Sequence, residues 1–80
     1  MKRIVIGQRG WVFVGTWSQE GAEIVLTDAS VIRRWGTERG LGQLALEGIQ
    51  PNTILDPTGT VRLHRLAVVG TLDCIHPSWT

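Results

Sequence analysis

Short runs of β-branched and aromatic residues, separated by glycine-rich turns, dominate the hydrophobic pattern of this 80-residue chain. Runs of this kind are typical of β-strands, whose side chains alternate between two faces. Gly15, inside the second run, predicts a bulge or a strong bend there. Asp28 to Ser30 is expected to interrupt extended structure. The predicted strands are 2–6, 11–17, 23–27, 31–35, 60–64 and 68–73, with turns at 7–10, 18–22 and 56–59.

One segment has a helical period instead. Leu41, Leu44 and Ala45 form an apolar stripe that predicts one short helix around residues 38–47. Thr37 is expected to cap its start and Gly48 its end. The fold class is therefore mainly β: one small antiparallel barrel domain spanning residues 1–80, with about five to six strands and one short helix. The tail, residues 75–80, is expected to be loosely held unless it docks.

Composition narrows the classes of function. The chain has 8 Lys and Arg against 7 Asp and Glu, whereas a general nucleic-acid coat is far more basic. Seven of the eight cations are Arg, which can bind phosphate through two parallel hydrogen bonds. An anionic ligand is therefore expected to bind at a local arginine site rather than over a broadly basic surface. No Cys/His spacing fits a metal and no run approaches a membrane span, so we expect no metal, no cofactor and no membrane. Small size favours a homo-oligomer, since a short chain buries little surface.

The segment 33–42 concentrates three Arg, one Trp and three Gly ahead of the predicted helix. We predict a binding loop there: main-chain N–H groups and Arg hold phosphate, and the Trp stacks on a base. The alternative is that the glycines form a turn, the Trp closes the barrel end and the Arg side chains are solvated. The predicted ligand-binding residues are Arg33, Arg34, Trp35, Gly36, Thr37, Arg39, Gly40 and Gly42.

A second cationic group comprises Arg62, His64 and Arg65. Arg62 and His64 share one strand face, opposite Val61 and Leu63. We predict that the three form a polar wall of the ligand site. The alternative is an ordinary solvated sheet face.

The remaining aromatic and nucleophilic residues indicate contacts rather than catalysis. Trp11 is expected to cap the barrel core, with ligand stacking as the alternative, and Trp17 and Trp79 are predicted at an interface. Cys74 and His76 lie two residues apart, but no third group is identifiable that would orient the histidine. We therefore expect no catalytic residues and no enzymatic activity.

The segment GWVFVGTWSQEGAEIVLTDA (10–29) resembles the first motif of Sm-like barrels of the bacterial Hfq type, and VRLHRLAVVGTL (61–72) resembles their second. This resemblance implies a small SH3-like or Sm-like barrel that forms a ring. The family's RNA-contacting Asp and Asn fall at Ser18, Gln19 and Glu20. Its Arg-Gly signature falls near Arg65, where this chain has no glycine. The family's RNA-binding residues therefore do not carry over.

A second resemblance, to short uncharacterised phage-type proteins, rests on WGTERGLGQLALEG (35–48) and TILDPTGTVRLHRLAVVGTLDC (53–74). It implies a phage-encoded accessory protein in the cytoplasm of a bacterial host. The lone cysteine fits that reducing compartment.

Together these observations predict a non-enzymatic homo-oligomer that sequesters a small phosphate-bearing nucleotide immune signal at its subunit junctions, an anti-defence sponge. An Sm-like RNA-binding protein is an alternative, which would show strong salt dependence. Another alternative is a protein-interaction or structural phage factor that uses Trp17, Trp79 and an open sheet edge. A hydrolase is the least favoured class.

Overall fold

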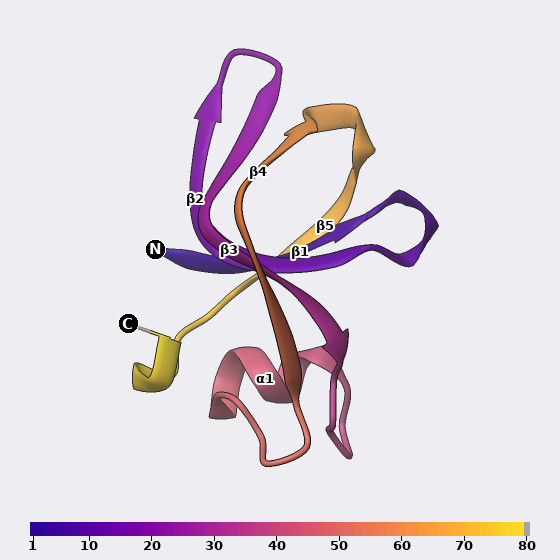
Figure 1. Ribbon diagram of the computed structural model, residues 1–80, viewed down its shortest axis with the longest axis vertical. Coiled ribbons are helices and arrows are strands. Elements are labelled where there is room, and N and C mark those ends of the chain that lie inside the picture. The colour runs from indigo at the N-terminus through magenta and orange to yellow at the C-terminus, as the bar shows by residue number, and fades with distance from the viewer. Residues whose placement is uncertain (80) are drawn as a thin grey trace.

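Five antiparallel strands form one strongly curved sheet, with a single short helix at one end (Figure 1). The computed structural model describes residues 1–79. The strand order is β4-β3-β2-β1-β5, so β4 and β5 are the two outer strands. This confirms the mainly β fold class. The elements are β1 (Lys2–Gly7), β2 (Val12–Glu20), β3 (Glu23–Arg34), α1 (Leu41–Glu47), β4 (Ile54–His64) and β5 (Val68–Asp73), with 3₁₀ turns at Gln8–Gly10, Arg65–Ala67 and Pro77–Trp79.

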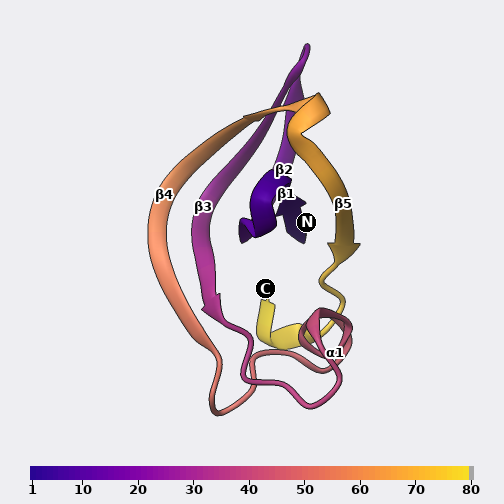
Figure 2. The ribbon, with the colours of Figure 1, turned by 90° about the vertical axis from the view of Figure 1, so that its right-hand side faces the viewer.

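Irregular pairing bends the sheet into its barrel-like outline, with β3 and β4 on one side and β5 on the other (Figure 2). The β2–β3 register shifts between Val14 and Thr16, which confirms the bulge predicted at Gly15. A β-carbon on Gly15 would lie only 3.1 Å from the β-carbons of Leu26 and Ala29, so this position needs glycine to let the strands approach.

Two predicted strand boundaries are wrong, because in each place the strand continues through residues that were expected to interrupt it. Asp28 has a left-handed φ of 53° and marks a second irregularity, but β3 continues through it as one strand. The six predicted runs therefore become five strands. β4 starts at Ile54, so the turn predicted at 56–59 lies within the strand. Pro57 has no N–H to donate, and it is tolerated because β4 is an outer strand.

The core lies on both faces of the sheet because consecutive strand residues point in opposite directions. On one face Ile4 and its neighbours pack against Leu44 and Ala45 of α1, which confirms the predicted apolar stripe. On the other face a smaller cluster contains Val5, Phe13, Leu26 and Ala29. No helix within residues 1–79 has the length and apolar character that crossing a membrane requires.

The helix begins at Leu41, later than predicted, and its N-cap is Gly40 rather than Thr37. The side-chain oxygen of Gln43 accepts hydrogen bonds from the main-chain N–H groups of Glu38 (3.0 Å) and Arg39 (2.9 Å), and so ties down the preceding loop. The end was predicted correctly: the N–H of Gly48, at φ 88°, donates to the Leu44 carbonyl at 2.9 Å.

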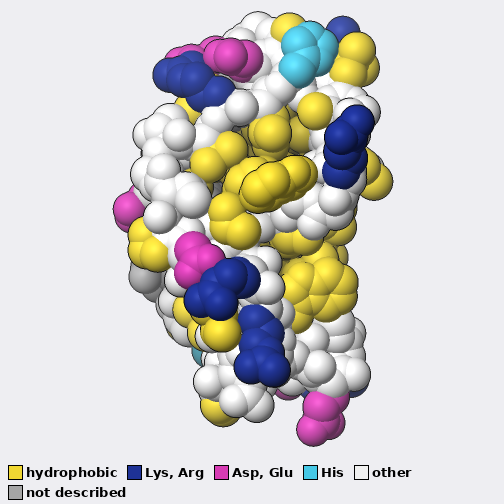
Figure 3. All heavy atoms as spheres, turned by 45° about the vertical axis from the view of Figure 1, so that its right-hand side comes forward, with side chains coloured by type: hydrophobic (Ala, Val, Ile, Leu, Met, Phe, Trp, Pro, Cys, Tyr) yellow, Lys and Arg dark blue, Asp and Glu magenta, His cyan; other side chains and the backbone are white. Residues whose placement is uncertain are grey.

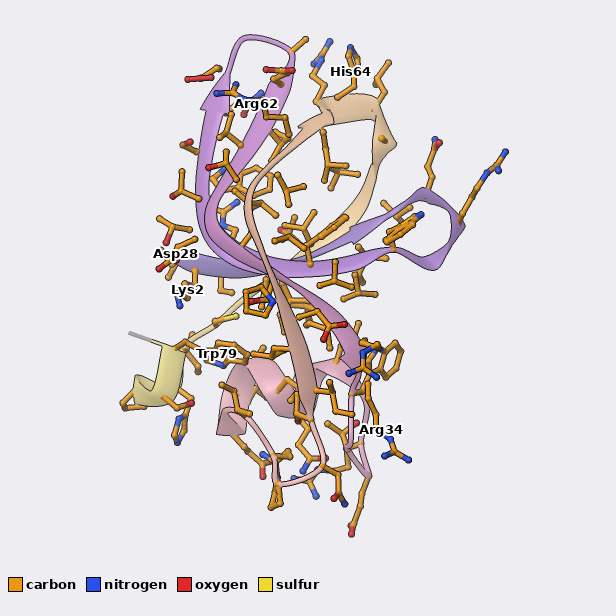
Figure 4. The ribbon with its side chains drawn as sticks, viewed as in Figure 1. Lys2, Asp28, Arg34, Arg62, His64 and Trp79 are labelled. Carbon is orange, nitrogen blue, oxygen red and sulfur yellow. The ribbon has the colours of Figure 1, made fainter. Side chains whose placement is uncertain are left out.

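The C-terminal segment docks onto the helix, which is the exception that the sequence analysis allowed for the tail; residue 80 lies outside the described residues. The N–H of Ile75 donates to the carbonyl of Ala45 at 3.0 Å. Trp79 is only 3 % exposed and lies beside α1 (Figure 4). It packs within its own chain and has little surface left for a neighbouring subunit, so its predicted role at an interface stays a prediction.

Candidate functional site

A groove of about 670 Å³ opens at the helix end of the molecule, and we call it the polar groove. It lies between the loop that follows β3, the exposed side of α1 and the loop that precedes β4. Much of this lining comes from the segment that the sequence singled out. Its lining residues are Arg34, Gly36, Thr37, Glu38, Arg39, Gln43, Glu47, Gln50, Pro51 and Asn52.

Gly36 sets the shape of the groove by bringing its two loops into direct contact. Its φ is 65°, and a β-carbon there would overlap main-chain atoms of Asn52 and Thr53. The hydroxyl of Thr53 donates to the carbonyl of Trp35 at 2.7 Å and accepts from the N–H of Gln50 at 3.0 Å. The glycine therefore has a packing role as well as a conformational one.

The charges in the groove are balanced, because two arginines face two glutamates. Arg39 hydrogen-bonds to Glu47 and forms an ion pair with it; this hydrogen bond raises the pKa of the Arg39 guanidinium. Arg34 has no carboxylate partner within residues 1–79. Arg34 is therefore the groove cation that is available to an anionic ligand.

Amide side chains supply the neutral hydrogen-bonding groups. Gln43 uses its oxygen on the loop but keeps its NH₂ group, and Gln50 donates to the carbonyl of Gly48 at 2.9 Å but keeps its oxygen. The Asn52 amide makes no hydrogen bond within the described part of the chain. Carbonyl and NH₂ groups of this kind match the donor and acceptor edges of a nucleobase.

Of the eight residues predicted in the first segment, four line the groove: Arg34, Gly36, Thr37 and Arg39. Arg33 does not, because its Nε is 2.7 Å from Asp56 Oδ2 on the neighbouring strand. Trp35 is 43 % exposed and lies against Gly40, outside the lining. It therefore does not close the barrel end.

Part of the predicted main-chain anion site is already occupied. Gln43 accepts hydrogen bonds from the N–H groups of Glu38 and Arg39, and Gly40 is the N-cap of α1. Arg34 is therefore the principal side-chain group in the groove for an anion.

The second cationic group lies at the opposite end of the molecule, where Figure 4 labels Arg62 and His64 far from Arg34. Arg62 contacts Glu20 at 3.0 Å and Glu23 at 3.1 Å, and the hydrogen bond to Glu20 contributes most to raising its pKa. His64 Nδ1 accepts from the N–H of Leu66 at 3.1 Å and so caps the 3₁₀ turn. Arg62, His64 and Arg65 therefore form no wall of the polar groove, and their exposed strand face matches the solvated alternative.

The tryptophans also differ from expectation. Trp11 is 58 % exposed and stacks on Phe13, with ring centroids 6.0 Å apart, so it does not cap the core as predicted. Trp17 is partly buried and packs under the Arg3 guanidinium at 4.6 Å. Its role at an interface stays a prediction.

The Cys74 and His76 pair does not form a nucleophilic dyad. Cys74 is buried, and burial raises the pKa of its thiol to about 11, so it is protonated near neutrality. The Nδ1 atom of His76 contacts the hydroxyl of Ser78 at 3.0 Å. Within residues 1–79, no cluster of His, Cys, Asp and Glu has the composition to hold a metal ion.

Sequence reasoning missed six of the ten lining residues: Glu38, Gln43, Glu47, Gln50, Pro51 and Asn52. Gln43 and Glu47 are one turn apart on α1, so a helical projection from Arg39 would have placed them on the same side. No local signal marks Gln50 and Asn52, which reach the groove only because the chain turns back after the helix.

No protein-family model matches this chain, and no curated protein matches it. Both resemblances drawn from the sequence therefore stay predictions, and the site is interpreted from its own geometry.

Proposed function

We propose that this protein is a non-enzymatic, homo-oligomeric binding protein that holds a small phosphate-bearing nucleotide in the polar groove. The observation that carries the proposal is the unpaired Arg34 guanidinium on a groove of about 670 Å³. That volume lies in the range typical of small-molecule sites.

Each part of the ligand has a matching group. Arg34 donates two parallel hydrogen bonds to a phosphate, and Arg39 adds a second cation when it turns away from Glu47. The free amide atoms of Gln43 and Asn52 pair with the edge of a base. Trp35, half-exposed beside the groove, offers a stacking face to a base that projects from it.

A neighbouring subunit would complete the site. The groove is open to solvent in the single chain, and an 80-residue chain gains stability from burying further surface. Covering the groove would exclude water and strengthen the contact between Arg34 and phosphate.

The biological role that fits this chemistry is capture. No step requires a nucleophile, a base or a metal, so the protein would act stoichiometrically. The resemblance of residues 35–48 and 53–74 to phage-type proteins supports sequestration of a host nucleotide immune signal as the role.

Native mass spectrometry of the protein purified from bacteria that produce such signals tests this directly. We expect an oligomer that carries one nucleotide mass per site and loses it in Arg34→Ala. Arg33→Ala is the matched control, because Arg33 is the neighbouring cation but is paired with Asp56 outside the groove. A ligand-free oligomer that stays unchanged after incubation with nucleotides, or equal binding by Arg34→Ala, would overturn the proposal. Binding of single-stranded RNA but not of mononucleotides would favour the RNA-binding alternative.

A further inference from the structure

A second groove, of about 320 Å³, lies on another part of the surface and shares no lining residue with the polar groove; we call it the apolar groove. The turns Gln8–Gly10 and Arg65–Ala67 flank it, and they approach because Gly7 pairs with Val68. Trp11 and Phe13 stack nearly parallel, at 5°, along one side. The lining residues are Gly7, Gln8, Trp11, Phe13, Leu63 and Ala67.

Hydrophobic surface extends beyond the groove itself. Leu66 is 72 % exposed and is next to Ala67 in the chain. Figure 3 shows hydrophobic side chains gathered in the middle of the face that it draws, with Lys and Arg side chains beside them. Exposed apolar surface is also a feature of sites that bind other proteins.

Unpaired cations border this surface. Arg9 belongs to the first flanking turn and Arg65 to the second, and neither has a carboxylate partner within residues 1–79. Arg9 also has a left-handed φ of 63°, a conformation that costs less with glycine. Residues in such conformations cluster at functional sites, which makes Arg9 a candidate contact residue.

We propose that the apolar groove binds a short segment of a partner protein that carries a large apolar residue flanked by Asp or Glu. The apolar residue fills the space beside Trp11 and Phe13, and the carboxylates pair with Arg9 and Arg65. Charge complementarity favours this partner over a second copy, because a two-fold contact through this groove would bring the like-charged arginines of both copies together. The mainly aliphatic and aromatic lining favours a peptide over a nucleotide.

Selection from a random peptide library on the immobilised intact protein tests the proposal without assuming a partner. We expect enriched peptides to combine a large apolar residue with Asp or Glu, and to lose binding to Trp11→Ala. Trp11 is 58 % exposed, so its truncation should leave the fold intact; Leu46→Ala, at an exposed apolar residue of α1, is the control that should bind normally. The double variant Arg9→Gln/Arg65→Gln should weaken binding about tenfold, as expected for the loss of two charge contacts.

Three results would overturn the proposal. One is that the same peptides are enriched on Trp11→Ala, and another is that the enriched peptides contain no excess of acidic residues. The third is that the solution mass falls to the monomer in Trp11→Ala alone, which would make the groove a contact between copies. Arg34→Ala should bind the peptides normally, so this test is independent of the nucleotide proposal.

Discussion

The indole Nε1 of Trp79 donates a 2.8 Å hydrogen bond to the carbonyl oxygen of Leu44, 35 residues earlier in the chain. Leu44 is fully buried, and Trp79 is 3 % exposed. This contact fastens the C-terminal segment onto α1, which itself forms one wall of the polar groove. The position of that wall therefore depends on a residue outside the groove.

Truncating Trp79 should destabilise the protein strongly. We expect Trp79→Ala to lower the free energy of unfolding by about 3–5 kcal/mol through the cavity that it leaves, and Trp79→Phe to cost less. Urea denaturation measures both. Leu46→Ala, at an exposed side chain, should stay within about 0.5 kcal/mol of wild type. Equal midpoints for Trp79→Ala and Leu46→Ala would contradict the docked position of Trp79.

Two glycine substitutions near the groove should have opposite effects. Gly36→Ala should destabilise by more than about 1 kcal/mol, because its φ of 65° strains an L residue and its β-carbon would overlap the Asn52 main chain. Gly42→Ala should stabilise by about 0.5–1 kcal/mol, because Gly42 lies within α1 and a β-carbon there meets nothing within 4 Å. Thermal unfolding measures both effects, and a change of the same sign in the two variants would contradict this account.

Alkaline pH should destabilise the fold through Cys74. Burial raises the pKa of its thiol from 9.0 to about 11, so between these values the unfolded chain has lost the proton that the folded chain keeps. The contribution of the thiol is therefore intact below pH 9.0 and is lost as the pH rises to about 11. Cys74→Ser should show a shallower loss of stability across this window in denaturation curves. Parallel curves for the two proteins would contradict the raised pKa.

Removing the carboxylate of Glu47 should strengthen nucleotide binding if the proposed function holds. Glu47→Gln keeps the side-chain size but weakens its hold on Arg39, which becomes free for phosphate. We expect the affinity to rise by about two- to fivefold in isothermal titration. Glu38→Gln removes the same charge from the groove but breaks no ion pair within residues 1–79, so it should have the smaller effect. A larger gain from Glu38→Gln would mean that the effect is not specific to Arg39.

Local pattern was enough to predict most of the strands, since the alternation of side chains is visible in the sequence itself. It failed for the start of β4, because Pro57 and Gly59 indicate a turn unless the strand is known to be an outer one. It did not reveal the docking partner of Trp79, because that partner, Leu44, is distant in the sequence. Boundaries and docking depend on which segments become neighbours, and one chain's local pattern does not contain that information.

The candidate site also contains residues that the local sequence predicted and residues that it could not predict. A local density of Arg and Gly was enough to single out Arg34, Gly36 and Arg39. The sequence did not separate Arg33 from Arg34, because the difference arises from Asp56 on the neighbouring strand. It grouped His64 with them by charge, although the strand carries that residue to the far end of the molecule (Figure 4).

The four tryptophans occupy four different environments, which makes the protein its own set of spectroscopic reporters. Trp79 is enclosed in the core, Trp17 lies under a guanidinium, and Trp11 and Trp35 are exposed beside the two grooves. The emission of the wild-type protein is therefore a sum of unlike signals. Variants that keep one indole and replace the other three with phenylalanine would follow unfolding, polar-groove occupancy and apolar-groove occupancy separately, without any added dye.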